Sequence, residues 1–167
     1  MELLIIRHAI AFERDPDRWP DDAARPLSPL GVRRSHKAAA GLKELCQVPD
    51  RLLTSPLIRA RQTAKIVTEV AGWPRAEITL ELKPGEGAAA LLTLLAKDRS
   101  ERIAIVGHQP DLSALLTACL LRDGASLSIE LKKNAVACLS FDGRARAGRA
   151  ALKWLATPHM LRGFRNP

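Results

Sequence analysis

A short apolar run near the start of the chain ends in a pair of polar residues, Arg7-His8. The run comprises residues 3–6 and contains only leucine and isoleucine, a pattern that is typical of a buried β-strand. A second apolar run, at residues 103–106, ends in Gly107-His108 in the same way. Open α/β sheets bind ligands at the carboxyl ends of their strands. The sequence therefore predicts that both histidines reach one edge of a sheet, where a ligand can contact them.

A third strand is predicted at residues 51–54, directly before Ser55-Pro56. Serine followed by proline is a frequent start of a helix, so we expect a helix to begin there and to carry Arg59 in its first turn. A guanidinium group is permanently charged and binds phosphate oxygens as a planar fork. Together with Arg7 and the two histidines, Arg59 indicates a site for an anion that also contains a nucleophile.

The order of the predicted elements indicates the fold class. Strands are expected at residues 2–7, 51–54, 78–80 and 102–106, and helices at residues 28–45, 55–71, 88–97 and 110–121. Three more strands are expected at residues 127–131, 135–141 and 150–155, and the last two flank a Gly/Arg-rich turn as a hairpin. This order predicts a three-layer α/β/α fold with a mostly parallel sheet. With 167 residues, no repeat and no linker, we expect a single domain over residues 1–167.

Composition narrows the possible partners. The net charge of +8 favours an anionic ligand, whereas a 4% aromatic content without tyrosine argues against a platform that stacks nucleic-acid bases. The three cysteines lie far apart and predict free thiols in a reducing compartment. No leader segment and no apolar stretch of bilayer length is recognisable. We therefore expect a cytoplasmic monomer without a membrane or nucleic-acid partner.

The four candidate site residues can be given chemical roles. A neutral imidazole at His8 is the candidate nucleophile, because it can form and release a covalent bond to phosphorus. Arg7 and Arg59 would bind phosphate oxygens, and their charge would help to keep His8 unprotonated. His108 would donate a hydrogen bond to a nonbridging oxygen. A metal site is the alternative for two histidines, but the cationic neighbours and the lack of adjacent carboxylates argue against it, so we expect no metal and no cofactor.

Three motifs resemble those of the histidine phosphatase superfamily. Residues 6–9 (Ile-Arg-His-Ala) resemble its Arg-His-Gly signature, with alanine in place of glycine. Residues 54–64 (Thr-Ser-Pro-Leu-Ile-Arg-Ala-Arg-Gln-Thr-Ala) resemble its second signature. Residues 106–110 (Val-Gly-His-Gln-Pro) resemble its third signature. The short length and residues 25–31 (Arg-Pro-Leu-Ser-Pro-Leu-Gly) resemble the SixA-type phosphohistidine phosphatases. The resemblance implies the phosphoglycerate-mutase-like (histidine phosphatase) fold and places phosphorylation on His8. It also implies a phosphate pocket of Arg7, Arg59 and His108, with Arg25 at the phosphate or beside the substrate.

The chain departs from the superfamily pattern in two places. Many members carry an asparagine in the loop after the Arg-His pair, but residues 9–40 contain none. Many also place a carboxylate general acid in an insertion after the second motif, where this chain has only a short segment. Glu81 and Glu86 in that segment are candidates for the acid or are ordinary surface residues. A missing acid would suit a leaving group that needs little help from protonation, such as imidazole.

These observations lead to one main functional hypothesis and two alternatives. The main hypothesis is a metal-independent phosphatase that hydrolyses a phosphomonoester or phosphoramidate through a phosphohistidine intermediate, with protein-borne phosphohistidine in signalling as its substrate. The first alternative is a phosphatase of sugar phosphates or other small metabolites. The second is a catalytically weak module that binds phosphate or polyanions, against which the intact set of arginines and histidines argues. Short segments around the site favour protein-borne phosphate over an enclosed metabolite.

Overall fold

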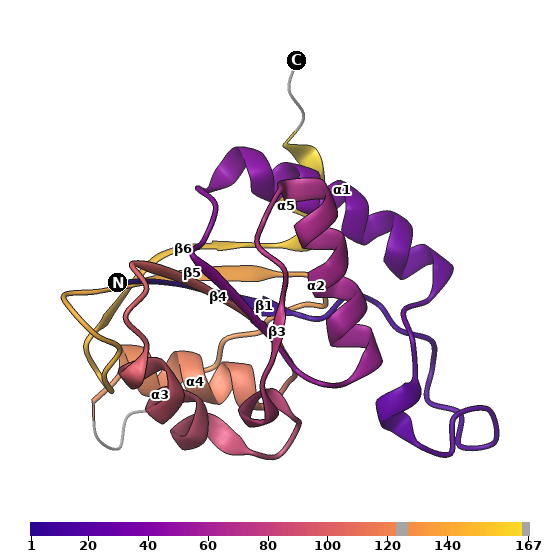
Figure 1. Ribbon diagram of the computed structural model, residues 1–167, viewed down its shortest axis with the longest axis horizontal. Helices are drawn as coiled ribbons and strands as arrows, with labels where there is room; N and C mark the ends of the chain where they lie inside the picture. The colour runs from indigo at the N-terminus through magenta and orange to yellow at the C-terminus, as the bar shows by residue number, and fades with distance from the viewer. Residues whose placement is uncertain (123–126, 165–167) are drawn as a thin grey trace.

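A six-stranded sheet forms the middle layer of the fold in a computed structural model that describes residues 1–122 and 127–164 (Figure 1). The strands are β1 (Glu2–Arg7), β2 (Arg51–Thr54), β3 (Glu77–Ile78), β4 (Arg102–Gly107), β5 (Val136–Phe141) and β6 (Ala150–Ala156). The helices are α1 (Pro29–Leu45), α2 (Ile58–Ala71), α3 (Gly87–Lys97), α4 (Asp111–Leu120) and α5 (Pro158–Gly163), with short 3₁₀ turns η1 (Asp22–Ala24) and η2 (Leu80–Leu82). Helices α1, α2 and α5 cover one face of the sheet, and α3 and α4 cover the other (Figure 1). The predicted three-layer α/β/α class is confirmed.

The topology of the sheet brings three strand ends to one edge. The strand order is β3-β2-β4-β1-β5-β6, in which β1 to β4 run parallel and β5 and β6 pair antiparallel. The predicted late hairpin is therefore confirmed. In the register, Arg7 lies opposite Gly107, and Thr54 lies opposite Val106. The residues that follow these positions must then emerge side by side.

The first strand is buried on both faces, as its continuous apolar sequence predicts. Alternate side chains of a strand point to opposite faces, and each inward-facing leucine or isoleucine contributes about 1.5–3 kcal/mol through burial. Leu4 and Ile6 belong to the cluster beneath α1, α2 and α5, which includes Leu42, Val67 and Leu161. Leu3 and Ile5 belong to the cluster beneath α3 and α4, which includes Leu95 and Leu115. Two packed layers therefore hold the end of β1 in place.

Helix α1 begins where the sequence predicts and fixes the loop that follows β1. The Ser28 hydroxyl accepts a hydrogen bond from the Gly31 backbone N–H at 3.0 Å, which caps the helix. A Cβ atom at Gly31 would lie 1.9 Å from the carbonyl oxygen of Ile10. Glycine is therefore required for this close approach, which presses the loop after β1 against α1.

The start of α2 differs from the prediction. The helix begins at Ile58, and Leu57 precedes it as a cap without a side-chain hydrogen bond. Ser55 does not cap the helix, because its backbone N–H continues the sheet pairing to the Val106 carbonyl at 3.0 Å and its hydroxyl contacts a histidine. The predicted helix end at Gly72 is confirmed, with φ at +72°. Arg59 still lies in the first turn, as expected.

The strand expected at residues 127–131 is wrong. These residues form no strand, because side chains rather than a neighbouring strand bind their carbonyl groups. The hydroxyl of Ser113 donates to Ile129 at 2.7 Å, that of Thr117 to Leu127 at 3.1 Å, and Arg7 donates to Leu131 at 2.7 Å. The free edge of β1 is taken by β5 instead.

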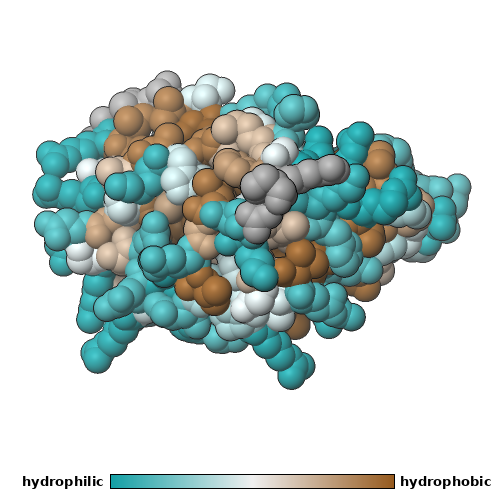
Figure 2. Space-filling view, turned by 90° about the horizontal axis from the view of Figure 1, so that it is seen from above, coloured by the Kyte–Doolittle hydropathy of each residue, from teal (hydrophilic) through white to brown (hydrophobic). Residues whose placement is uncertain are grey.

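The outer surface is mixed in polarity. Figure 2 views the molecule from above and shows hydrophilic residues along its edges with hydrophobic residues gathered between them. On β6 and α5, Leu152 is 44% exposed and Met160 is 51% exposed, which is ordinary for single apolar residues. Among the residues that the structure describes, no helix has both the length and the apolar character needed to cross a membrane.

Candidate active site

The two predicted histidines meet at the carboxyl edge of the sheet. The backbone N–H of His8 donates to the Gly107 carbonyl at 3.1 Å, so the chain after β1 stays next to the end of β4. The ring centroids of His8 and His108 lie 5.0 Å apart, and both residues are buried. The structure thus brings together side chains that lie a hundred positions apart, as the strand-end argument predicts.

The contacts of His8 leave one ring nitrogen free. Its Nδ1 lies 2.7 Å from the carbonyl oxygen of Ala9. A carbonyl can only accept, so a neutral ring bound in this way carries its proton on Nδ1. The lone pair then resides on Nε2. An imidazole in this tautomer can act as a nucleophile through Nε2 while the backbone holds the ring in orientation.

His108 is held by a serine at the end of the neighbouring strand. Its Nε2 lies 2.9 Å from the hydroxyl oxygen of Ser55, which also accepts from the backbone N–H of Leu57 at 3.3 Å. The hydroxyl keeps its own proton beside the contact with Leu57, so it can donate that proton to Nε2. The proton of a neutral His108 then lies on Nδ1, where it can be donated to an oxyanion.

Two arginines share one carboxylate beside the histidines. Arg59 is 5% exposed, and its Nη2 forms an ion pair of 3.0 Å with Asp22, whose backbone carbonyl also accepts from Arg59 Nη1 at 2.8 Å. Arg25 binds the other carboxylate oxygen of Asp22 at 2.8 Å and donates to the carbonyl of Phe12 at 2.6 Å. The structure therefore places the predicted Arg25 next to Arg59.

Several buried donors among these residues have no partner. In the described parts of the chain, buried side-chain atoms without a hydrogen bond are found in five residues, and three of them are predicted site residues: Arg7 Nε, Arg59 Nε and His108 Nδ1, beside Trp73 Nε1 and Asn134 Nδ2. Most buried polar atoms in folded proteins are satisfied, and each exception asks for an explanation. Three unpaired donors on the predicted anion-binding residues fit a pocket that takes an anionic ligand.

The electrostatic surroundings keep both rings uncharged. Burial, followed by His108 and the charges of Arg59 and Arg7, lowers the pKa of His8 to about 3, against the opposing effect of the Ala9 carbonyl. Burial also lowers the pKa of His108 to about 3, assisted mainly by Arg59. Both imidazoles are therefore neutral at physiological pH. A neutral ring is the form in which His8 can attack phosphorus.

These low pKa values predict a loss of stability in acid. The pKa of each ring is about 3 in the folded protein but about 6.5 in the unfolded chain, so the unfolded chain binds more protons between these values. The stability contribution is complete above pH 6.5 and decreases as the pH falls. At pH 5 each histidine should lower the free energy of unfolding by about 2 kcal/mol. Urea unfolding at pH 7 and pH 5 measures the decrease.

The matched variants for this measurement are His8→Gln and His36→Gln. The first removes one buried ring and should make the decrease about 2 kcal/mol smaller. The second removes a ring that is exposed on α1 and should leave the decrease as in the wild type. Equal decreases in the wild type and in His8→Gln would contradict the assignment of His8 as a buried neutral ring.

Three contacting residues were not anticipated from the sequence. Asp22 bridges Arg25 and Arg59, and Ser55 holds His108. The Thr63 hydroxyl accepts from the Ala9 N–H at 3.0 Å and donates to the Arg59 carbonyl at 2.7 Å, which joins the loop after His8 to α2. The ion pair between Asp22 and Arg25 could have been predicted from their spacing, because oppositely charged residues three apart in a helical turn can form an ion pair.

The candidate general acids lie on the segment before α3. Glu81 accepts a hydrogen bond from the Thr79 hydroxyl at 3.1 Å, and Glu86 is exposed at the residue that precedes α3. The contact of Glu81 with Thr79 does not involve a histidine of the site. In residues 1–122 and 127–164, no three side chains of His, Cys, Asp or Glu gather closely enough to hold a metal ion.

Comparison with known proteins connects this geometry to a family. Residues 3–84 match the model of the histidine phosphatase superfamily (branch 1). An uncharacterised protein of Picosynechococcus sp. is 36% identical over 115 residues, which cover 67% of this chain and 68% of that protein.

Solved structures agree with this match. The protein histidine phosphatase SixA, solved with tungstate, superposes with a TM-score of 0.76 at 26% identity, covering 96% of this chain and 99% of that one. A mycobacterial glucosyl-3-phosphoglycerate phosphatase shares the fold with a TM-score of 0.66 at 18% identity, covering 91% and 96% of the two chains. The chain belongs to the histidine phosphatase superfamily, branch 1, and is a phosphatase.

Proposed function

We propose that this phosphatase removes phosphate from protein-borne phosphohistidine through a covalent intermediate on His8. The observation that carries the proposal is the state of His8. Its Nδ1 is bound to the Ala9 carbonyl, its pKa is lowered to about 3, and the centroid of its ring lies 5.0 Å from that of His108. A neutral, oriented imidazole in a cationic pocket is suited to attack on a phosphoryl group.

In the first step, the Nε2 lone pair of His8 forms a bond to phosphorus, and the bond from phosphorus to the leaving group breaks. The leaving group departs with the electron pair of that bond and takes a proton from solvent. Arg7 and Arg59 bind the charged equatorial oxygens, and His108 donates its Nδ1 proton to one of them. Arg25, which binds the same Asp22 carboxylate as Arg59, would contact the phosphate or the flank of the substrate.

In the second step, water attacks the phosphorus of phosphorylated His8. The phosphorus–nitrogen bond breaks, its electron pair returns to Nε2, and phosphate leaves after the water has lost a proton to solvent. The reaction needs only water as co-reactant. Splitting the transfer into two displacements makes each step easier than direct hydrolysis.

Three observations support phosphohistidine as the substrate. Glu81 binds the Thr79 hydroxyl rather than a histidine of the site, and Glu86 is exposed before α3. A site without a strong general acid favours an imidazole leaving group over an alkoxide. The chain also carries a net charge of +8, which steers acidic phosphoprotein surfaces toward it. A solved structure with 26% identity is that of a protein histidine phosphatase.

A competition assay tests the substrate. The kcat/KM for a phosphohistidine protein should exceed those for sugar phosphates and for phosphoserine and phosphotyrosine peptides by at least about tenfold, or 1.4 kcal/mol in the transition state. The same substrates are measured with His8→Ala to subtract background hydrolysis. If a sugar phosphate is preferred by the same factor, the protein is a metabolite phosphatase, which is the second candidate function.

Turnover should be independent of divalent metal ions. The positive charge that binds phosphate comes from arginines that are already in place, so magnesium has no part to supply. We expect EDTA to leave kcat unchanged and tungstate, a phosphate mimic, to inhibit competitively. Activity that disappears in EDTA and returns with a divalent ion would contradict this expectation.

We also place the protein in the cytoplasm, where it would act as a monomer in phosphohistidine signalling. Support comes from the cysteines: Cys46, Cys119 and Cys138 are free thiols in the structure. Burial raises the pKa of the Cys119 and Cys138 thiols to about 12, so they are poorly reactive. Free, inert thiols suit a reducing compartment.

A further inference from the structure

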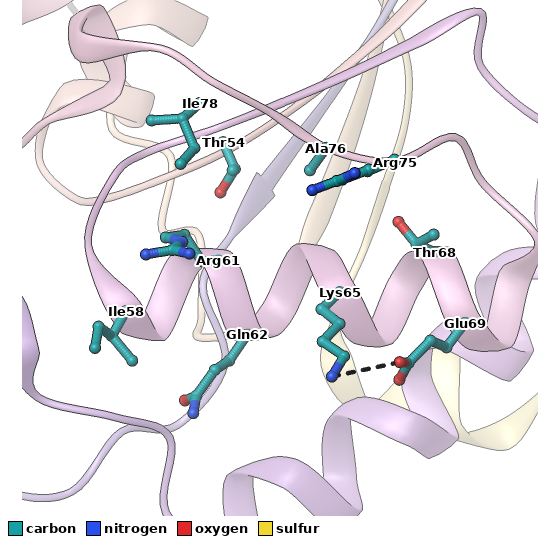
Figure 3. Close-up of a pocket in the computed structure, with 10 residues that line it drawn as sticks. All are labelled: Thr54, Ile58, Arg61, Gln62, Lys65, Thr68, Glu69, Arg75, Ala76 and Ile78. Carbon is teal, nitrogen blue, oxygen red and sulfur yellow. Dashed lines mark ion pairs between the residues drawn. The ribbon is translucent and has the colours of Figure 1, made fainter.

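A groove runs along α2 on the side of the edge strand β3. It has a volume of about 500 Å³ and lies between α2 and the segment that leads into β3. Figure 3 shows Arg61 on the helix side of this groove and Arg75 on the opposite side, with Ile58 and Ile78 at one end. None of these four residues is part of the phosphate pocket described above.

The groove carries an excess of positive charge. Its charged lining residues are Arg61, Lys65, Arg75 and Glu69. Lys65 and Glu69 compensate each other in an exposed ion pair of 3.7 Å. Arg61 and Arg75 are exposed and take part in no ion pair within the described residues. Two guanidinium groups therefore remain to attract an anionic partner.

The groove adjoins the candidate active site. Two of its lining residues, Thr54 and Ile58, are the chain neighbours of Ser55 and Arg59, which belong to the site. The groove thus starts at the end of β2 and the beginning of α2, the same two elements that carry Ser55 and Arg59, so a chain that extends from a phosphate at Arg59 can enter it there. The exposed apolar side chains of Ile78 and Leu80, at 54% and 65% exposure, extend this surface. Such a surface fits a polypeptide better than a small metabolite, which would leave these apolar groups uncovered.

We propose that the groove between α2 and β3 binds acidic side chains of the phosphoprotein substrate that lie close to its phosphohistidine. The inference rests on the proposed function, because it assigns the part of the substrate next to the transferred phosphate. Arg61 and Arg75 select acidic flanking residues, and Ile58 and Ile78 contact apolar ones. Specificity then arises from charge complementarity outside the pocket where phosphate is transferred.

Two synthetic peptides test the proposal directly. Both carry one phosphohistidine at the same position, flanked by four glutamates in one peptide and by four glutamines in the other. We expect the wild type to prefer the glutamate peptide by about tenfold in kcat/KM at low salt, mainly through KM. The preference should diminish at about 0.5 M salt, because exposed charges are screened.

The variant R61E/R75E should lose or reverse this preference while hydrolysing the small substrate phosphoramidate at the wild-type rate. The matched control is R144E/R146E, which makes the same charge change in the exposed turn between β5 and β6. This turn follows Phe141, whose backbone N–H binds the Met1 carbonyl. Met1 precedes β1 and His8 follows it, so the turn lies at the other end of the strand from the histidines. If charge reversal impairs folding, the milder variant R61Q/R75Q replaces it, and we expect this variant to lose the preference for the glutamate peptide as well.

The outcomes separate the docking proposal from the proposed function. If the wild type hydrolyses both peptides and R61E/R75E behaves like R144E/R146E, the groove has no role in docking and the proposed function stands. If the wild type hydrolyses phosphoramidate but neither peptide, the proposed substrate is wrong, and the docking proposal falls with it. If the preference for the glutamate peptide is lost in R61E/R75E but kept in R144E/R146E, the result supports both the docking proposal and the proposed function.

Discussion

The variant His8→Ala is expected to lose at least about a thousandfold in kcat, the scale on which removal of a covalent nucleophile acts. Alanine removes the nitrogen that bonds to phosphorus, and no neighbouring side chain can replace it, because the Nε2 of His108 is held by Ser55 at 2.9 Å. Phosphoramidate hydrolysis under saturating substrate measures the loss.

Trapping the intermediate provides the positive half of this test. Acid-free quenching of the wild type during turnover of labelled substrate should leave label on the protein that is stable in base and released by acid, as a phosphorus–nitrogen bond requires. His36→Ala changes an exposed histidine on α1 and should retain both turnover and label. Robust turnover by His8→Ala would refute the covalent mechanism.

The second large effect is expected at Arg59. The variant Arg59→Lys keeps the charge but loses the planar fork, and we expect kcat/KM to fall by about tenfold or more. The side chain is 5% exposed and has a fixed position through Asp22, so a flexible ammonium cannot reproduce its contacts. Steady-state kinetics with phosphoramidate give the effect.

The control for Arg59→Lys is Arg61→Lys, the same substitution two residues further along α2. Arg61 is exposed and lies in the groove rather than in the phosphate pocket, so its variant should hydrolyse phosphoramidate at the wild-type rate. Tungstate inhibition should weaken in Arg59→Lys and not in Arg61→Lys. Wild-type kinetics in Arg59→Lys would remove Arg59 from the phosphate pocket.

The meeting of His8 and His108 could be predicted from the sequence because it depends on two simple properties of sheets. Continuous apolar runs identify buried strands, and parallel strands present their carboxyl ends at one edge. The register that places Arg7 opposite Gly107 is a direct result. Ser28 could be predicted as a helix cap for an equally local reason. Its hydroxyl accepts a hydrogen bond from the backbone N–H of Gly31, only three residues further along the chain.

Contacts that depend on the path of a loop could not be predicted in this way. Asp22 reaches Arg59 across 37 positions of sequence, and only the folded loop after β1 brings them together. Ser55 has the local sequence of a helix cap. In the structure, however, its backbone N–H binds the Val106 carbonyl in the sheet and its hydroxyl contacts His108. At residues 127–131 an apolar pattern predicts a strand, whereas β5 already occupies the edge of β1.

The carboxylate of Asp22 is an anion of the protein that already binds Arg25 and Arg59. Its contacts with Arg25 and Arg59 hold the pKa of that carboxyl below its usual range, so it stays charged at every pH at which the enzyme would work. A phosphate that enters must share these arginines with Asp22 or displace it. We therefore expect the variant Asp22→Asn to bind free phosphate and tungstate more tightly than the wild type does. Asp22 is thus a carboxylate of the protein itself that competes with any phosphate for Arg25 and Arg59.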